Sequence, residues 1–373
     1  MTDPIANWWK AFESAAPRIV AHFRQQDWDL PTWMQEHLGA VHPELMWEFG
    51  PAVRGQGHRL VITPETRRDL RPLVREMLRR APAITGWEFY EYRLPEELSE
   101  ASQSVQGRTS GNLNGVQVVA SLGHFNLVDL KYNFPPDSFD EQEAAGIAFV
   151  ATESLLGEEV LDRWIGAIEV EQGMAAERLI PLERLSEAVR SLIGEVCAAL
   201  PDRPWHEADL DDALWSALEC EREAADDYVG QEDLIAAITV MPLMLQNALS
   251  NFLFDSQRYS RFGERFCYLK IDGSSGLEHS DFADRSEIEE AINAALRPTG
   301  LGSVVGGGTG LRYSYIELAL TDIEAAWHSM SVVLSNGRLP KRTWLLFHDA
   351  DLAAQWYGLY DDTPEPPMCQ QDG

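Results

Sequence analysis

The sequence predicts an α+β fold with two structured regions joined by an acidic connector. Apolar residues recur every three or four positions in some segments and every second position in others, which indicates amphipathic helices and half-buried strands. The chain has 373 residues, enough for about two domains. Apolar residues make up 45% of it and charged residues 24%, a composition typical of globular proteins.

Residues 1–200 are predicted to form an N-terminal α+β domain with an antiparallel sheet. The segment 4–26 gathers its apolar side chains on one helical face, although Pro17 is expected to kink or divide the helix. Thr63 and Pro64 have the order of an N-cap and the first residue of the helix that follows. The other predicted elements are helices over 66–80, 141–156 and 182–200 and strands over 45–49, 59–63, 87–93, 116–121, 125–134 and 165–170, the first two strands forming a hairpin.

Residues 201–260 are predicted to be an acidic helical connector. Within residues 201–233, twelve acidic residues oppose two arginines, which gives this stretch a net charge of −10. The same stretch carries Trp205, Leu210 and Trp215, so we expect its apolar face to dock on a neighbouring part of the chain.

Residues 261–360 are predicted to form a ferredoxin-like domain, because their expected elements follow the order β-α-β-β-α-β. In that arrangement two helices cover one face of an antiparallel sheet. The tail over 361–373 contains Pro364, Pro366 and Pro367 and ends in polar residues, so we expect it to be disordered. The expected strands of this domain cover 266–271, 302–305, 313–320 and 342–347, and the helices cover 286–296 and 322–334.

The charge balance disfavours some partners and permits others. The chain has 30 basic and 60 acidic residues, a formal net charge of −30. Nucleic-acid binding relies on Lys and Arg displacing counterions, so direct nucleic-acid binding is disfavoured. The same negative field repels anionic lipid headgroups and raises the encounter rate with a basic protein, which is therefore a permitted partner.

Neither the N-terminal residues nor the cysteines point to export. Residues 1–9 lack the features of a secretory signal, and the longest apolar segment, 234–245, is interrupted by Pro242. The four cysteines are spaced too widely for a zinc knuckle or a redox motif and are expected to be reduced. We therefore expect a cytoplasmic protein without a membrane segment. The cysteines are Cys197, Cys220, Cys267 and Cys369.

A glycine-rich segment over 300–310 is the most conspicuous candidate for a ligand site. A loop containing Gly306, Gly307, Gly308 and Gly310 could bring backbone N–H groups close to a phosphate. The spacing fits neither a dinucleotide fingerprint nor a P-loop, so a tight turn or bulge in a β-hairpin is the more ordinary interpretation. No cofactor is predicted.

Two histidines near the C-terminus are further candidates. His279 and His348 each follow a predicted strand and have acidic neighbours in the sequence. If both loops emerge at one end of the sheet, an imidazole with several carboxylates could bind a divalent metal or act as a base. With 60 acidic residues in the chain, however, most histidines have a carboxylate nearby by chance, so no metal site is predicted. No serine or cysteine has the flanking residues of a known nucleophile, and nucleophilic hydrolysis is not expected.

Four arginines lie three or four residues apart along one predicted helix and share one face. The stripe could dock on an acidic surface, either on the chain's own connector or on a second copy of the chain in a homodimer. A site for an anionic substrate is the alternative. The arginines are Arg68, Arg71, Arg75 and Arg79, and the connector's candidate residues are Asp209, Asp211 and Asp212.

Four short sequence motifs stand out between residues 45 and 170. They are WEFGP at 47–51, HRLVITPE at 58–65, AITGWEFY at 83–90 and LLGE at 155–158. Together they resemble the motifs of a family of uncharacterised bacterial proteins. Some α+β domains of that family are similar to domains associated with regulators of RNase E. Those regulators are small acidic proteins that bind another protein. The resemblance supplies no catalytic motif and implies binding in preference to catalysis.

These observations favour a non-enzymatic cytoplasmic interaction module, either a regulator or an immunity-type inhibitor, that binds a basic protein through an acidic surface. The alternative is an enzyme or small-ligand sensor that uses the glycine segment 300–310 with His279 or His348. The two hypotheses differ in whether these groups converge on a concave pocket.

Overall fold

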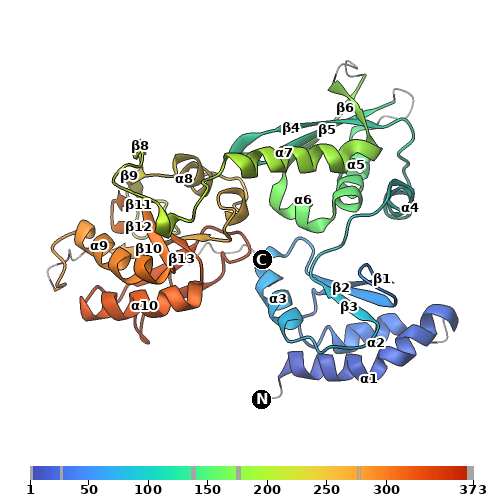
Figure 1. Ribbon diagram of the computed structural model, residues 1–373, viewed down its shortest axis with the longest axis horizontal. Coiled ribbons are helices and arrows are strands. Elements are labelled where there is room, and N and C mark those ends of the chain that lie inside the picture. Colours follow the sequence, from blue (N-terminus) through green and yellow to red (C-terminus); the bar gives the residue numbers. More distant parts are fainter. Residues whose placement is uncertain are drawn as a thin grey trace. The chain divides into compact units, whose positions relative to one another are not determined.

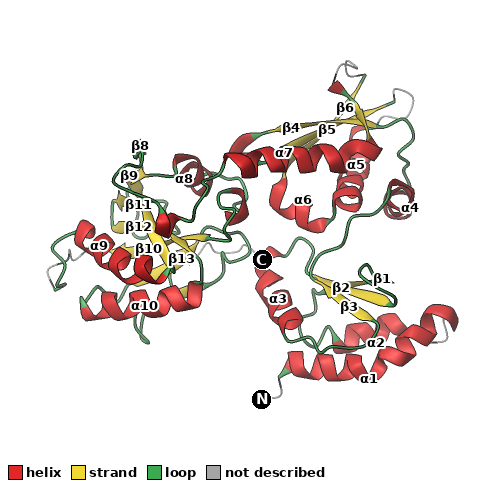
Figure 2. Cartoon of the chain, in the orientation of Figure 1, coloured by secondary structure: helices red, strands yellow, loops and turns green. Residues whose placement is uncertain are grey.

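The computed structural model divides the chain into two compact units (Figure 1). It describes residues 3–25, 28–135, 140–173, 178–274, 277 and 279–367. Unit 1 comprises residues 1–120 and 129–188, and unit 2 comprises residues 121–128 and 189–373. Helices and strands occur in both units (Figure 2), so the predicted α+β class is confirmed.

The N-terminal part of unit 1 packs helices and a three-stranded sheet around an aromatic core. Trp8 and Trp9 of helix α1 are 1% and 4% exposed, and Phe12 beside them is fully buried. Pro17 lies inside α1 without ending it, so the predicted N-terminal helix forms one continuous element. The elements are α1 (Pro4–Gln25), α2 (Leu30–His37), β1 (Met46–Pro51), β2 (His58–Thr63), α3 (Arg71–Arg79) and β3 (Trp87–Tyr90).

The three-stranded sheet is mixed. β1 and β2 form the predicted antiparallel hairpin, in which Met46 lies opposite Thr63. β2 and β3 run parallel, with His58 opposite Trp87, so the expectation of an antiparallel sheet is wrong here. The reason is that α3 separates these two strands in the sequence, and a helical crossover returns the chain in the same direction.

The helix α3 begins later than the sequence suggests. Thr63 is the last residue of β2 and is not an N-cap, because its hydroxyl donates to the Glu158 carboxylate (2.5 Å) and accepts from the N–H of Glu65 (3.0 Å). A 3-10 turn over Arg68–Leu70 precedes the helix, which starts at Arg71 without a side-chain cap.

A four-stranded sheet with the order β6-β5-β4-β7 follows. The predicted helix over 141–156 is confirmed at its bounds as α5. The sequence pattern does not reveal α4, because only Ala101 and Val105 are buried in it, or α6, which follows Gly157 directly. The elements of this stretch are α4 (Leu98–Thr109), β4 (Gln117–Leu122), β5 (Val128–Phe134), α5 (Glu141–Leu156), α6 (Glu158–Trp164), β6 (Ile165–Gln172), β7 (Ile180–Pro181) and α7 (Leu185–Ala199).

Unit 2 is built on a seven-stranded sheet with the order β14-β13-β10-β12-β11-β9-β8. Neighbouring strands pair antiparallel throughout. Along the chain, β10, α9, β11, β12, α10 and β13 follow one another in the predicted order of strands and helices. The elements of unit 2 are β8 (Ser216–Glu219), β9 (Leu234–Thr239), α8 (Pro242–Ala248), β10 (Arg265–Asp272), α9 (Arg285–Leu296), β11 (Gly302–Gly310), β12 (Tyr313–Leu320), α10 (Ile323–Asn336), β13 (Thr343–Phe347) and β14 (Trp356–Gly358).

The two faces of the seven-stranded sheet are covered differently. The helices α9 and α10 cover one face, where Ile292 and Met330 join an apolar core with strand residues such as Leu269 (Figure 1). Side chains that alternate with these along the strands point to the second face and meet residues of the 201–260 stretch. Buried aromatic strand residues of this second face include Phe266, Tyr268, Tyr313, Tyr315 and Trp344.

The expectation that residues 201–260 form a helical connector is wrong. This stretch supplies the strands β8 and β9 at one edge of the sheet, and its helix α8 has only seven residues. Leu234, Ala237 and Leu245 of the stretch are buried against the second face of the sheet. Its apolar residues therefore extend and cover a sheet instead of forming an independent helical link.

The beginning of the predicted disordered tail is ordered by contacts with the sheet. The indole N–H of Trp344 donates to the carbonyl of Pro364 (2.7 Å), and the N–H of Tyr360 donates to the hydroxyl of Thr363 (2.8 Å). Disorder from residue 361 onward is therefore a wrong expectation for residues up to 367, and the rest of the tail lies outside the described residues.

Candidate functional site

The strand β8 leaves one edge of the seven-stranded sheet open. The N–H of Cys220 bonds to the carbonyl of Ile235 (2.9 Å). Leu218 lies two residues before Cys220, so the register directs its backbone N–H and C=O groups toward β9 as well. In an antiparallel pair, alternate residues turn their N–H and C=O groups away from the partner strand. Ala217 and Glu219 therefore direct these groups toward the open edge, where no strand of the described chain pairs with them.

Exposed apolar side chains lie beside this edge. Leu214 is 87% exposed, and Trp215, which directly precedes β8, is 42% exposed. Ile238 lies opposite Ala217 in β9 and is 45% exposed. Large apolar side chains next to an unpaired strand edge are a feature of interaction surfaces.

The acidic residues that precede β8 are on the surface. Asp209, Asp211 and Asp212 are exposed, and within the described chain none of them forms an ion pair with Lys or Arg. Their location fits the predicted interaction role, which stays a prediction. We refer to these three residues together with Leu214, Trp215 and the strand Ser216–Glu219 as the β8 surface.

A cavity of about 290 Å³ lies beside the second predicted ligand residue, His348. The His348 side chain is 4% exposed, and its ring stacks on Tyr268 with 4.8 Å between the ring centroids. Ala248 and Leu249 form apolar parts of the cavity wall. The polar and charged lining residues besides Tyr268 are Arg222, Gln231, Glu232, Ser250 and His348.

A buried carboxylate orients the imidazole of His348. Its Nε2 lies 2.7 Å from Oε2 of Glu317, and Gln231 donates its amide N–H to Oε1 of Glu317 (2.5 Å). A carboxylate accepts hydrogen bonds, so Nε2 carries the ring proton. The other ring nitrogen, Nδ1, bonds to no residue that the structure describes and is left to accept a hydrogen bond.

The carboxylate that meets His348 is not its neighbour in the sequence. Asp349 accepts hydrogen bonds from the N–H and the hydroxyl of Ser256 (2.7 and 2.6 Å) and pairs with Arg265 (3.2 Å). Burial raises the pKa of Asp349 to about 6. The acidic partner of His348 is therefore Glu317, which lies 31 positions earlier in the sequence, and not the neighbouring Asp349.

The hypothesis that His279 and His348 meet at one end of the sheet is wrong. β10 and β13 are antiparallel, and Cys267 near the start of β10 lies opposite Phe347 at the end of β13. His348 therefore lies near the start of β10, whereas His279 follows the end of β10 and is exposed. Antiparallel pairing separates the two imidazoles by the length of a strand.

The glycine segment is a strand of a β-hairpin with β12, and its register shifts between Val304 and Gly306, so the predicted bulge in a hairpin is confirmed and the alternative of a phosphate-binding loop is wrong. β11 lies between β12 and β9, where its backbone belongs to the sheet. A Cβ atom would lie 2.8 Å from the carbonyl oxygen of Ile238 at Gly306, 2.4 Å from Oε1 of Glu289 at Gly307, and 2.4 Å from Cδ1 of Leu234 at Gly308. These glycines therefore allow close packing against the neighbouring elements.

Gly310 makes room for a buried carboxylate. A Cβ atom there would lie 2.3 Å from Oδ2 of Asp233. Asp233 is fully buried and accepts hydrogen bonds from the N–H groups of Arg312 (2.8 Å) and Tyr313 (2.9 Å) and from the hydroxyl of Tyr315. The Asp233 carboxylate thereby holds the connection between β11 and β12.

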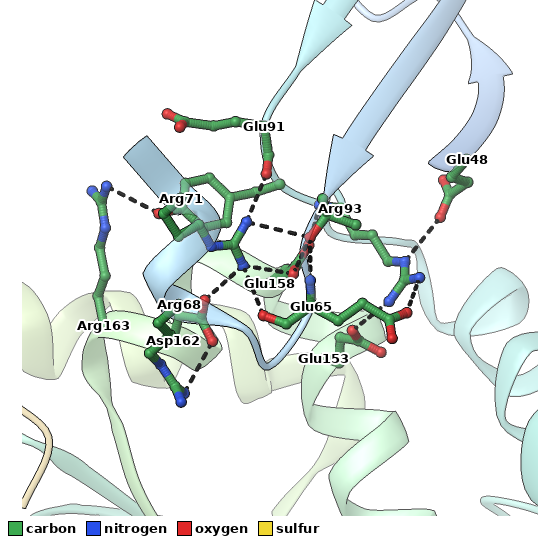
Figure 3. A network of polar contacts seen from close by, with 12 residues as sticks. Glu48, Glu65, Arg68, Arg71, Glu91, Arg93, Glu153, Glu158, Asp162 and Arg163 are labelled. Carbon is green, nitrogen blue, oxygen red and sulfur yellow. Dashed lines mark hydrogen bonds and ion pairs between the residues drawn. The ribbon is translucent and has the colours of Figure 1, made fainter. Parts of the chain in front are cut away.

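Arg68 and Arg71 of the arginine stripe are part of an ion-pair network inside unit 1 (Figure 3). Arg71 is 1% exposed, and its Nη2 lies 2.6 Å from Oε1 of Glu158 and 2.7 Å from Oδ2 of Asp162, both on α6. Arg68 pairs with the same Asp162 at 3.2 Å. The guanidinium of Arg71 also lies 4.1 Å from the centroid of the Tyr92 ring.

The remaining contacts of Glu158 tie this network to the sheet. Its Oε2 accepts from the backbone N–H of Arg93 (2.9 Å), and its Oε1 accepts from the Thr63 hydroxyl at the end of β2. Arg93 also pairs with Glu153 of α5 at 3.0 Å (Figure 3). The network therefore joins the two parts of unit 1 through groups that are buried and multiply bonded.

The outer arginines of the stripe have acidic partners closer to the surface. Arg75 pairs with Glu91 at 3.4 Å, and Arg79 pairs with Glu76 at 2.6 Å. Together with the pairs of Arg68 and Arg71, these contacts lie within unit 1. Docking of the stripe on Asp209, Asp211 and Asp212 or on a second copy of the chain stays a prediction.

Sequence reasoning missed the two carboxylates that organise these sites. Glu317 interrupts the apolar strand 313–320, and a charged residue at a buried strand position is a signal of a specific partner. Glu158 follows Gly157, whose φ of 81° ends α5 and allows α6 to start in a new direction. No local pattern connects either carboxylate with its distant partner.

No group of three or more His, Cys, Asp or Glu side chains in the described residues is placed to hold a metal ion. In the same part of the chain, no helix is both long enough and apolar enough to cross a bilayer. Comparisons of the chain with family models, curated proteins and solved structures give no match.

Proposed function

We propose that this protein is an interaction module that binds a basic protein through the β8 surface. The observation that carries the proposal is an open strand edge bordered by exposed apolar side chains and by carboxylates that form no ion pair within the described chain. An extended segment of a partner can add to such an edge through backbone hydrogen bonds, while its side chains contact the neighbouring surface.

The charge of the chain favours a basic partner. The formal net charge is −30, and the 201–233 stretch alone contributes −10 from twelve acidic residues and two arginines. Exposed charges of this kind act mainly on the association rate, whereas buried apolar contacts supply most of the affinity. We therefore expect added salt to slow association more than it accelerates dissociation.

The sheet order supports a ferredoxin-like core under this surface. The strands β13-β10-β12-β11 lie side by side, and α9 and α10 pack on one face of them. β9 and β8 extend this core and carry the interaction edge. Because this fold serves many functions, the proposal rests on the surface and not on the fold.

Residues 45–170 resemble a family of uncharacterised bacterial proteins, some of whose α+β domains are similar to those associated with RNase E regulators, and this resemblance also favours binding. It is the basis for proposing a cytoplasmic regulator or an immunity-type inhibitor. Both kinds of protein act by occupying a surface of another protein and need no catalytic group.

Site-specific photocrosslinking tests the proposed interface. The full chain with p-benzoylphenylalanine at position 217 is irradiated in its native host, and the crosslinked protein is then purified and its binding kinetics are measured. We expect a basic protein whose association rate falls as salt is raised. A crosslinked partner that is acidic, or whose binding kinetics do not respond to salt, would contradict the proposal.

A pair of matched variants locates the interface. Leu214→Asp places a charge on the β8 surface and is expected to weaken binding of the purified partner about tenfold or more, whereas Val332→Asp on α10 is the control. Val332 is 50% exposed, so both variants change an exposed apolar side chain. Equal loss of binding in the two variants would place the interface elsewhere.

A further inference from the structure

The cavity beside His348 is a second site, separate from the proposed interaction edge. We propose that it binds a small zwitterionic amino acid with an apolar side chain, with Arg222 holding the carboxylate and His348 and Glu232 holding the ammonium group. The cavity volume of about 290 Å³ lies at the lower end of the ~300–1,000 Å³ of typical ligand pockets. It therefore suits a molecule smaller than a nucleotide.

Arg222 supplies the positive end of the site. Its Nε donates to the carbonyl of Leu234 (3.2 Å), and this hydrogen bond positions the guanidinium group. The two terminal nitrogens of the group bond to no residue that the structure describes. A guanidinium can bind a carboxylate through two parallel hydrogen bonds. The exposed side of Arg222 is therefore suited to the carboxylate of a ligand.

His348 supplies an oriented acceptor. Glu317 accepts from Nε2 of His348 and from Gln231, so both of its oxygens are engaged and the ring cannot turn without losing a buried hydrogen bond. Stacking on Tyr268 holds the ring plane. Nδ1 is then the ring atom that remains to accept a hydrogen bond from the N–H of a bound ammonium group.

Glu232 supplies the negative charge that an ammonium group requires. One of its oxygens accepts from the N–H of Val229 (3.2 Å), and the residue lines the same cavity as Arg222. The two opposite charges form no ion pair with each other, since both are described and their charged atoms are more than 4 Å apart. A cavity with separated, unpaired charges of opposite sign matches the two ends of a zwitterion.

The remaining wall selects the ligand's side chain. Ala248 and Leu249 present apolar atoms to the cavity, which Tyr268 also lines. An apolar side chain gains by leaving water for such a wall, whereas a polar side chain loses hydrogen bonds there. Branched or aromatic amino acids are therefore expected to bind more tightly than serine or asparagine.

Calorimetric titration of the full chain with matched probes tests the ligand class. L-leucine, L-valine, L-methionine and L-phenylalanine are compared with 4-methylpentanoic acid, which is leucine without its amino group, and with 3-methylbutylamine, which is leucine without its carboxylate. We expect at least one of the amino acids to bind and each truncated leucine to bind at least about tenfold more weakly than leucine. The proposal is overturned if none of the four amino acids binds at about 10 mM, or if a truncated probe binds as well as leucine.

Variants with matched controls assign the residues. Arg222→Gln and His348→Gln are each expected to weaken amino-acid binding at least about tenfold, whereas Arg203→Gln and His279→Gln leave it unchanged. Arg222 is exposed, so its variant is expected to fold even if the loss of buried His348 does not permit folding. Equal binding by the parent and the folded Arg222→Gln variant would reject the assignment. Retained binding of the partner protein by these variants separates this site from the proposed interaction function.

Discussion

The network around Arg71 in unit 1 and the β8 surface in unit 2 use charged side chains in opposite ways. In the network, Arg71 is 1% exposed and meets two carboxylates within 2.7 Å. On the β8 surface, Asp211 and Asp212 are exposed and have no cationic partner among the described residues. The difference lies in burial and pairing, because both regions are built from the same ionisable groups.

This comparison shows why charge counts alone do not identify a binding surface. In a poorly solvated interior, an unpaired charge is costly, so each buried arginine or carboxylate must be matched by a partner within the fold. On the surface, water and salt screen charges, and an excess of one sign costs little. Arg68 and Arg71 of the stripe are therefore bound by carboxylates within unit 1, while the aspartates of the β8 surface have no cationic partner among the described residues.

Removal of a partner from the buried network should have the largest effect. Arg71→Met leaves Glu158 and Asp162 buried without their main cation, and we expect it to lower the free energy of unfolding by roughly 3–5 kcal/mol. Urea denaturation of the full chain measures this change. Arg79→Gln on the same helix is the control, because the Arg79 side chain is 72% exposed, and it should change stability by less than about 0.5 kcal/mol. Similar costs for the two variants would remove the distinction between buried and exposed charges.

Lys270 differs from both regions, because it is a buried charge without an ion pair in the described chain. It is fully buried, donates to the carbonyl of Tyr228 and lies 4.1 Å from the centroid of the Tyr313 ring. Burial lowers its pKa to about 8, below the ~10.4 expected for an unfolded lysine. Between these two values the unfolded chain holds a proton that the folded chain has released. The free energy of unfolding should therefore rise with pH in this window, by at most about 1.4 kcal/mol per pH unit.

Urea unfolding of the parent and of Lys270→Met between pH 7.5 and 10 measures this contribution. The variant should lack the part of the alkaline rise that Lys270 supplies, so the stability difference between the two proteins should depend on pH. Lys341→Met, at a side chain that is 64% exposed, is the control and should keep the slope of the parent. Parallel pH profiles for the parent and Lys270→Met would show that this lysine titrates normally.

Neutralising the β8 surface should have the smallest effect on stability. The triple variant Asp209→Asn, Asp211→Asn, Asp212→Asn should change the free energy of unfolding by less than about 0.5 kcal/mol, because these carboxylates are exposed and unpaired in the described chain. The same variant should slow association with a basic partner. A loss of more than about 1 kcal/mol in urea denaturation would mean that the aspartates serve folding, as Glu158 does.

Local patterns in the sequence predicted those parts of the fold that depend on local physics. The helix over 141–156, whose first turn is capped by Asp140, and the hairpin of β1 and β2 both occur in the structure. The strands β8 and β9 lie in an acidic stretch whose charge obscures the alternation of its few apolar residues. β9 pairs with β11, more than sixty residues away, and β8 pairs with β9, so neither strand can be recognised from a local pattern alone.

The candidate sites were predictable only in part, for the same reason. His348 and the aspartates before β8 lie at a cavity and on the surface, but the partners of His348, Glu317 and Gln231, come from distant segments. The glycines of 300–310 have the composition of a loop, yet they form a strand because bulky neighbours on β9 and α9 fill the space that side chains would need. The partners of His348 and the strand conformation of the glycine segment both depend on packing between distant parts of the chain, which a local sequence pattern does not reveal.

The contact between Gly310 and Asp233 also limits how this chain can evolve. Any side chain at position 310 would occupy the place of the Asp233 carboxylate, so a mutation there alone would displace the acceptor of two backbone N–H groups. A smaller residue at position 233 would free the space but leave those groups without their acceptor. Neither single step is neutral, and we expect the two positions to persist together or to change together in the descendants of this sequence.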